Sequence, residues 1–150
     1  MVGQQYEGVP PSSLTLRAQS VAQERHRDQV DRHGRPVVEH LERVAARVPP
    51  SARPVAYVHD VCERSPLSPA DVAGLVGLDE DELEALELLT KRRGEPLWAH
   101  TRRVRDATGG PGRELAVTIK RADLEDHANH AQSDSQYAAA IDLLETERPS

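Results

Sequence analysis

Aromatic residues are scarce in this sequence, which has no Phe, one Trp and three Tyr among its 150 residues. The core must therefore be built from Leu, Val and Ala, which suits packing of helix on helix better than a β-sandwich. No segment alternates β-branched and polar residues over a useful length, which argues against a sheet. The length fits one domain, and it is sufficient to bury a core without a disulfide or a structural metal.

The sequence also has only one cysteine and no long apolar run. Cys62 is the only cysteine, so an internal disulfide is excluded and a reducing compartment is expected. No apolar run approaches the roughly 20 residues of a membrane span, and the first residues lack the apolar core of a signal peptide. We therefore expect a cytoplasmic protein with no membrane partner.

Lysine is rare too, because Lys91 and Lys120 are the only lysines among 19 basic residues. Basic and acidic residues are interspersed, and the formal net charge is −6. Nothing in this balance calls for a nucleic-acid polymer or a membrane surface as a partner. Basic clusters such as Lys91-Arg92-Arg93 would attract an anionic substrate, although a solvated helix face explains them more simply.

Helical periodicity and helix-stop signals predict an all-α fold, a single bundle of seven or eight helices. Residues 1–13, which include Pro10-Pro11, are expected to form a loose tail, and residues 14–150 to form the domain. The glycine-rich segment 109–112 is expected to be a flexible connector. The predicted helices cover approximately residues 14–31, 36–48, 52–63, 69–76, 79–90, 96–107, 115–122 and 137–144.

The dipeptide His59-Asp60 lies in the predicted helix 52–63, which is apolar nearly all round. Imidazole and carboxylate groups should not be buried without partners, and together they suit Mn, Fe, Mg or Zn. For the dipeptide taken alone, a hydrogen-bonded pair inside the bundle is the better explanation. His40 on the preceding helix and Asp123 after a later apolar stretch extend the set to two His and two Asp from three helices. Such a set would form a mixed nitrogen and oxygen metal site with room for water.

The order His40, His59-Asp60, Asp123 resembles the H…HD…D signature of the HD superfamily of metal-dependent phosphohydrolases. The chain is most similar to short stand-alone RelA/SpoT-type HD proteins, whose relatives remove a 3′-pyrophosphate from (p)ppGpp. The resemblance covers residues 16–145, and the matching segments run in the same order. They are His26-Arg27-Asp28-Gln29, Gly34-Arg35-Pro36, Arg43-Val44-Ala45, Tyr57 to Glu63, Leu89-Thr90-Lys91 and Ile119 to Asp123.

This resemblance implies that His40, His59, Asp60 and Asp123 bind one divalent metal ion, commonly Mn²⁺, with Fe²⁺, Mg²⁺ and Zn²⁺ as alternatives. It also implies that Glu63 is catalytic and orients or deprotonates a water molecule, a role that a carboxylate one helical turn past His59 can reach. A solvated acid at a helix end is the competing explanation for Glu63. The implied substrate is a phosphorylated nucleotide or a similar small metabolite.

Departures from the family pattern fall among the residues that would contact the substrate. Arg64 follows Glu63 where the family has a second acid, and His127 stands where an Asn is expected. Asp31 replaces an Arg that stacks on guanine in alarmone hydrolases, whereas the neighbouring Arg32 matches a basic residue of the family. We therefore expect Arg32 and Arg64 to contact phosphate and His127 to line the pocket.

The sequence as a whole predicts a divergent metal-dependent phosphohydrolase that acts on a small phosphorylated metabolite. One alternative is an HD domain that binds a nucleotide or a protein partner without catalysis, and another is a helical interaction module without a metal. A homo-oligomer is compatible with all of these. His127 and His130, three residues apart, offer a weaker second metal pair, and His26 is expected to have a structural hydrogen-bonding role.

Overall fold

The computed structural model describes residues 8–130 and 135–146, and within these ranges all regular structure is helical apart from one isolated β-bridge. The predicted all-α fold class is confirmed. The predicted number of helices also holds for these ranges when α3 and α4 count as the single predicted helix 52–63. The helices are α1 (Ser13–Arg25), α2 (Val37–Ala46), the 3-10 helix η2 (Pro50–Ala52), α3 (Arg53–Val58), α4 (Val61–Arg64), α5 (Pro69–Val76), α6 (Glu80–Leu89), α7 (Leu97–Asp106), α8 (Pro111–His130) and α9 (Gln136–Glu145).

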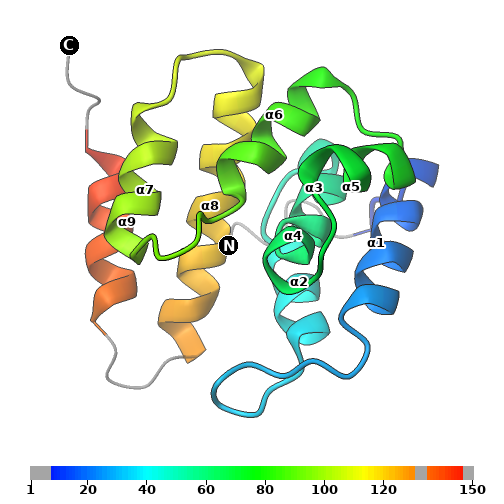
Figure 1. Ribbon diagram of the computed structural model, residues 1–150, viewed down its shortest axis with the longest axis horizontal. Coiled ribbons are helices and arrows are strands. Elements are labelled where there is room, and N and C mark those ends of the chain that lie inside the picture. Colours follow the sequence, from blue (N-terminus) through cyan, green and yellow to red (C-terminus); the bar gives the residue numbers. More distant parts are fainter. Residues whose placement is uncertain (1–7, 131–134, 147–150) are drawn as a thin grey trace.

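The helices form two packed groups that share one core (Figure 1). Helices α7, α8 and α9 pack together on one side, and α1 to α5 lie on the other. Helix α6 contacts both groups, since it packs against α3 and α5 as well as against α8, and α2 also reaches α8. The seam between the groups therefore runs along α2, α3, α6 and α8.

The core is built almost entirely from Val, Leu and Ala, as the scarcity of aromatic residues predicts. One cluster of buried apolar side chains draws on α1, α2, α3, α5, α6, α7, α8 and α9, with Tyr57 as its buried aromatic member. Leu41, Leu86 and Leu124 are completely buried in it. None of the described helices combines the length and the apolar character that a membrane crossing requires.

Several helix starts follow the signals in the sequence. Ser68 caps α5 and Asp79 caps α6, each in a reciprocal capping box with the acid three residues later. Gly77 ends α5 with a φ of 94°, a left-handed conformation that glycine adopts without strain. Helix α1 begins at Ser13, capped by Ser12, and residues 1–7 of the predicted tail lie outside the described ranges.

The first helix ends earlier than predicted, at Arg25 instead of Asp31. Beyond it, the carboxylate of Asp31 accepts hydrogen bonds from the backbone N–H groups of His33 and Arg35, at 2.8 and 3.0 Å. A short acidic side chain that binds nearby backbone amides in this way competes with helix formation. Residues 26–36 consequently form a loop that leads from α1 into α2.

The predicted helix 52–63 is interrupted at His59 and Asp60, which form a turn between α3 and α4. The Nδ1 atom of His59 lies 2.6 Å from the carbonyl oxygen of Ala56. A continuous helix would use this oxygen for the backbone N–H of Asp60. The side chain of His59 therefore occupies the carbonyl oxygen that the next backbone N–H of the helix would need. The helix stops there, and the chain turns at His59 and Asp60, two of the predicted metal ligands.

The expected connector 109–112 is shorter than predicted, because α8 already begins at Pro111. Proline favours the first position of a helix, where its missing N–H is not needed. Gly112 is buried beside α6, and an added Cβ atom would lie 2.7 Å from Oε1 of Glu84. This glycine lets α6 and α8 approach closely, and α8 then runs without a break past Asp123.

Candidate metal centre

All eight residues predicted for metal binding, catalysis and substrate contact line a single cavity. Its volume is about 700 Å³. The walls come from the loop before α2, from α2, from the turn between α3 and α4, from the segment 89–100 and from α8 and α9. The eight residues are His40, His59, Asp60, Asp123, Glu63, Arg32, Arg64 and His127.

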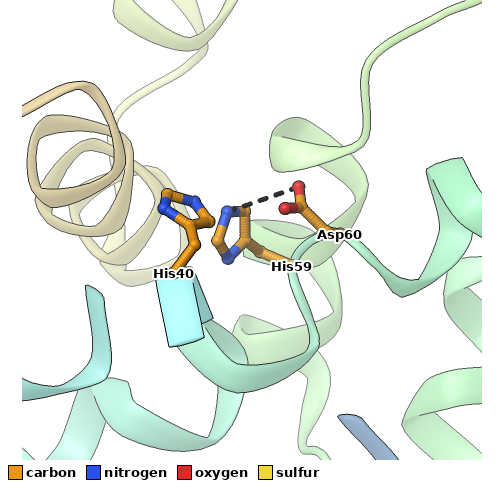
Figure 2. Close-up of side chains that lie close together, drawn as sticks. All are labelled: His40, His59 and Asp60. Carbon is orange, nitrogen blue, oxygen red and sulfur yellow. Dashed lines mark ion pairs between the residues drawn. The ribbon is translucent and has the colours of Figure 1, made fainter. Parts of the chain in front are cut away.

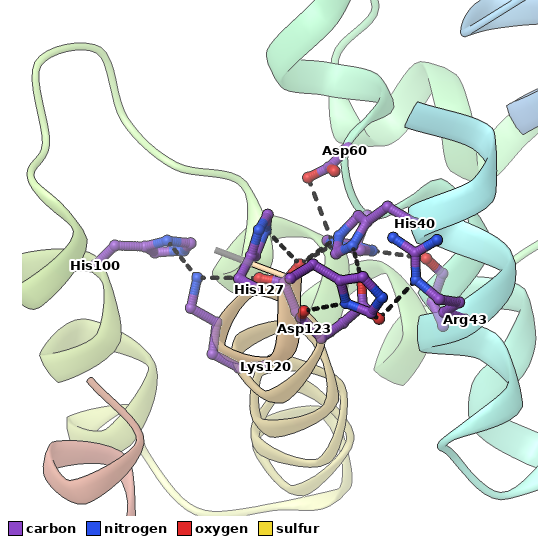
Figure 3. Close-up of polar contacts among 11 residues, drawn as sticks. His40, Arg43, Asp60, His100, Lys120, Asp123 and His127 are labelled. Carbon is purple, nitrogen blue, oxygen red and sulfur yellow. Dashed lines mark hydrogen bonds and ion pairs between the residues drawn. The ribbon is translucent and has the colours of Figure 1, made fainter. Parts of the chain in front are cut away.

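Asp123 lies at the centre of the cluster of predicted metal ligands (Figure 3). Its Oδ1 atom is 2.8 Å from Nε2 of His40, 3.1 Å from Nε2 of His59 and 3.4 Å from Nε2 of His127. Asp60 joins the cluster through His59, since the distance between His59 Nε2 and Asp60 Oδ1 is 3.4 Å (Figure 2). Helix α2, the α3–α4 turn and α8 thus bring their donor atoms together, as predicted.

The spacing of these atoms fits the coordination sphere of a metal ion. Two ligands that bind one ion at about 2.1 Å lie about 3.0 Å apart at an octahedral edge and about 3.4 Å apart at a tetrahedral edge. The measured spacings of 2.8 to 3.4 Å span these two values. Two groups of donor atoms, His40 with His59 and Asp60 and His40 with Asp123 and His127, each lie within 4.8 Å of one another. These groups could hold a metal ion, and His127 joins the four predicted residues as a candidate ligand.

His40 is oriented by a carboxylate that sequence reasoning missed. Its Nδ1 atom lies 2.7 Å from Oδ2 of Asp126, and the other carboxylate oxygen of Asp126 accepts a hydrogen bond from Nε of Arg43 at 2.8 Å. Metal-binding histidines usually donate their second N–H to such a carboxylate, which fixes the ring and its tautomer. Asp126 follows Asp123 by three residues, so helical spacing already places both on one face of α8.

His59 is fixed in an equivalent way by the backbone. Because its Nδ1 faces the carbonyl oxygen of Ala56, which only accepts, that nitrogen carries a proton, and Nε2, which faces Asp123, is the nitrogen that would bind an ion once deprotonated. His40 and His59 therefore present the same ring nitrogen to the cavity, each held by an acceptor on the far side of the ring.

The contact between Asp126 and His40 leads to a first prediction. An Asp126→Asn variant, which keeps the side-chain volume, is expected to bind Mn²⁺ about 10- to 100-fold more weakly than the wild type. The reason is that His40 loses a charged acceptor that holds its ring in place. Calorimetric titration measures the change, and Glu125→Gln on the same helix serves as the matched control. An unchanged affinity in Asp126→Asn would show that the orientation of His40 does not depend on this contact.

Opposite charges balance one another within the cluster. Burial raises the pKa of Asp123, but its hydrogen bonds with His127, His40 and His59 outweigh burial and hold this pKa well below its usual range. Burial lowers the pKa of His40, but hydrogen bonds with Asp123 and Asp126 raise it to about 10. Burial also lowers the pKa of His59, but the charge of Asp60 and a hydrogen bond with Asp123 outweigh it and raise this pKa to about 9. Each buried charge therefore has a partner of the opposite sign, which its burial requires.

Glu63 lies on the cavity wall with its side chain open to solvent. Partial desolvation by the cavity walls, together with the negative charge of Asp60, raises its pKa to about 7. A carboxyl group with a pKa near neutrality can take up and release a proton at the pH at which it works. The place of Glu63 on the cavity wall is compatible with the catalytic role, and its exposure is compatible with a solvated acid at a helix end.

The predicted substrate-binding residues, Arg32, Arg64 and His127, line the same cavity. Arg32 comes from the loop before α2, and Arg64 ends α4, where its carbonyl oxygen accepts a hydrogen bond of 3.2 Å from Gln29. His127 is stacked on Tyr137 of α9, with ring centroids 4.8 Å apart and planes inclined by 12°. Sequence reasoning missed Tyr137 as a cavity residue, because its contact depends on the docking of α9 against α8.

Two further histidines take the roles expected for structural residues. His26 is buried, and its Nδ1 atom lies 2.7 Å from the amide oxygen of Gln29. His130 places its Nδ1 atom 2.8 Å from the carbonyl oxygen of Asp126, one helical turn earlier. Among the described residues, His130 does not join His127 in any group of candidate metal ligands.

The segment between α6 and α7 forms one rim of the cavity and is tied down by Arg103. The Arg103 guanidinium group donates two hydrogen bonds of 2.9 Å to the carboxylate of Glu95 and a third, of 3.1 Å, to the carbonyl oxygen of Thr90. These bonds hold the pKa of Glu95 down to about 2. Lys91 and Pro96 on this segment line the cavity, so the ion pair shapes its rim.

This ion pair predicts a pH-dependent stability difference. The pKa of Glu95 is lower in the folded protein than the value of about 4.3 expected in the unfolded chain. The pair therefore stabilises the fold above about pH 4.3, and this contribution is lost as the pH falls towards about 2. Urea denaturation of wild type and Glu95→Gln should show a difference that is largest at about pH 5 to 7 and shrinks towards pH 3. Glu87→Gln, at an exposed position of α6, should track the wild type, and a Glu95→Gln difference independent of pH would contradict the assignment.

No protein-family model matches the chain, and no curated protein matches it significantly.

Proposed function

We propose that the protein is a divergent metal-dependent phosphohydrolase of the HD type. The observation that carries this proposal is the convergence of eight residues, predicted from separate segments of the sequence, on one cavity. Its substrate would be a phosphorylated nucleotide or a similar small metabolite, of the kind represented by (p)ppGpp. A nucleic-acid polymer and a membrane are not part of this proposal, and the single cysteine supports a cytoplasmic setting.

The charges along the cavity support an anionic substrate. Arg32, Arg64, Lys91 and Lys120 all line it, although the formal net charge of the chain is −6. The carboxylates of Asp31, Asp60, Glu63 and Asp123 line the cavity as well, so it would favour an anion once a bound divalent ion offsets part of their charge. The volume of about 700 Å³ falls within the range of small-molecule sites, and it suits a nucleotide-sized ligand.

Each residue has a chemical role in this proposal. His40, His59, Asp60 and Asp123 would hold the divalent ion, most simply Mn²⁺, through two imidazole nitrogens and two carboxylates. The ion would supply Lewis-acid chemistry and lower the pKa of water. Glu63 would accept the proton of the attacking water, since its pKa of about 7 allows proton uptake near neutral pH. The cations that line the cavity would neutralise the phosphate oxygens.

The proposal is tested by metal-dependent turnover. The protein is stripped with a chelator, reloaded separately with Mn²⁺, Fe²⁺, Mg²⁺ or Zn²⁺, and incubated with phosphorylated nucleotides that include a guanosine 3′-pyrophosphate. We expect release of phosphate or pyrophosphate that requires the added metal and disappears in Asp60→Ala. Turnover that persists in Asp60→Ala would show that another site, or a contaminant, is responsible.

A second candidate function is nucleotide binding without catalysis. Arg64 favours it, because this cation lines the cavity where the resembling family has the second acid of its catalytic pair. In that case a nucleotide should raise the melting temperature of the metal-loaded protein while the release of phosphate stays at background.

A further inference from the structure

The wall of the cavity contains a buried lysine, Lys120, which the proposed function counts only among the cations of the lining. Lys120 lies on α8, and only 5% of its surface is exposed. Its Nζ atom is 3.8 Å from Oδ2 of Asp123, the oxygen opposite to the one that contacts the histidines. A lysine is almost never buried without partners, because desolvation of its charge is costly. The position of this ammonium group beside the candidate metal centre therefore needs an explanation.

His100 on α7 holds the lysine in place (Figure 3). Its Nδ1 atom lies 3.2 Å from Nζ of Lys120, and its Nε2 atom lies 3.0 Å from the carbonyl oxygen of Leu88. A carbonyl only accepts hydrogen bonds, so Nε2 carries the ring proton, and Nδ1 is then the acceptor that faces the ammonium group. His100 is itself 2% exposed and lines the cavity. The hydrogen bonds from His100 to Leu88 and from Lys120 to His100 thus each have a defined donor and acceptor.

The ammonium group has three N–H donors. His100 takes one of them, and a second points towards Asp123 at the longer distance of 3.8 Å. The remaining donor capacity lies at the wall of the cavity, which Lys120 lines. A phosphoryl group held near the metal ligands would be within reach of it.

We propose that Lys120 binds a phosphoryl oxygen of the substrate and that His100 is the residue that positions it. This inference rests on the proposed function, which it deepens by naming the anchor of the reacting phosphate. Lys91, the only other lysine of the sequence, differs because it is exposed at the rim. A rim cation attracts the substrate, whereas a buried cation with a fixed direction selects a phosphoryl group at one place.

The simpler role for Lys120 would be to balance the charge of Asp123. The two roles separate in a binding experiment that does not depend on turnover. Lys120→Met removes the ammonium group and keeps most of the stem, and Arg121→Met removes a cation from the next position of α8, which does not line the cavity. For each protein, metal content is measured by elemental analysis, and binding of radiolabelled inorganic phosphate to the Mn²⁺-loaded form is measured by equilibrium dialysis.

We expect Lys120→Met to retain its metal and to bind phosphate at least about tenfold more weakly, the loss typical of one hydrogen bond to a charged group. Arg121→Met should behave as the wild type. Unchanged phosphate binding in Lys120→Met would overturn the proposal, and so would a loss of phosphate binding that merely follows a loss of metal. Should Lys120→Met fail to fold, Lys120→Gln keeps a donor for His100 without the charge, and the same criteria apply.

The positioning role of His100 is tested by a double-mutant cycle. His100→Leu should weaken phosphate binding in the wild-type background and have no further effect in the Lys120→Met background. His100→Asn, whose amide oxygen can accept from Lys120, should restore part of the loss. Equal effects of His100→Leu in both backgrounds would mean that the histidine supports the fold only. A wild type that binds phosphate but hydrolyses no nucleotide would refute the proposed function and leave the assignment of Lys120 intact.

Discussion

An Asp123→Asn variant is expected to purify without bound metal and to lose at least about a thousandfold of any metal-dependent hydrolysis. The substitution keeps the size of the side chain and removes its charge. Asp123 is the residue that His40, His59 and His127 all approach, at 2.8 to 3.4 Å through one carboxylate oxygen. A neutral amide is a weaker ligand for a hard divalent ion. Loss of the ion removes several kcal/mol of transition-state stabilisation, which corresponds to this factor in rate.

The measurement pairs elemental analysis with a turnover assay. Asp142→Asn is the matched control, because Asp142 is an exposed carboxylate on α9 that does not line the cavity. The control should keep the metal content and the rate of the wild type. Full metal occupancy in Asp123→Asn would refute the central place of Asp123 in the candidate metal centre, whatever its effect on the rate.

The second large effect is expected in the core that supports the site. Leu86→Ala should lower the free energy of unfolding by about 3 kcal/mol, since Leu86 is completely buried and the loss of its side chain leaves a cavity. Leu86 lies on α6, which packs against α8, the helix that carries Asp123 and His127. The substitution therefore weakens the packing of α6 against α8, the helix that positions part of the candidate metal centre.

Urea denaturation measures this loss, with Leu75→Ala as the matched control. Leu75 lies on α5 and is 51% exposed, so the same chemical change there should alter the free energy of unfolding by less than about 0.5 kcal/mol. A similar loss in both variants would show that the α6 position is not part of the rigid core.

The helices could be predicted from the sequence because their start signals are local. Ser68 and Asp79 each cap a helix through a reciprocal pair of hydrogen bonds with the acid three residues later. Two of the errors arose where a side chain binds backbone groups. Asp31 binds two amides of the loop that follows α1, and His59 takes the carbonyl that would continue α3. Hydrophobic periodicity contains no information about such competition.

The residues of the candidate site were predictable as far as the family signature reaches. His40, His59, Asp60 and Asp123 lie on one cavity, as the order of the motifs suggests. The residues that orient these side chains could not be predicted in this way, because their contacts depend on how the helices dock. His100 meets α8 only through the packing of α7, and nothing in its local sequence indicates this contact. Sequence reasoning thus selected four residues that meet at one cavity and missed the residues that fix their side-chain orientation.

The contact between His40 and Asp123 joins positions that are 83 residues apart. Closing a flexible loop of this length costs an unfolded chain about 4 kcal/mol. In the unfolded chain, only the adjacent residues His59 and Asp60 would therefore be close enough together to bind one ion. An ion bound in this site is therefore a cross-link that only the folded chain can form. Metal uptake would come after folding, and the bound ion would slow unfolding by clamping α2 to α8. In this respect the protein would differ from small zinc domains, in which the metal itself drives folding.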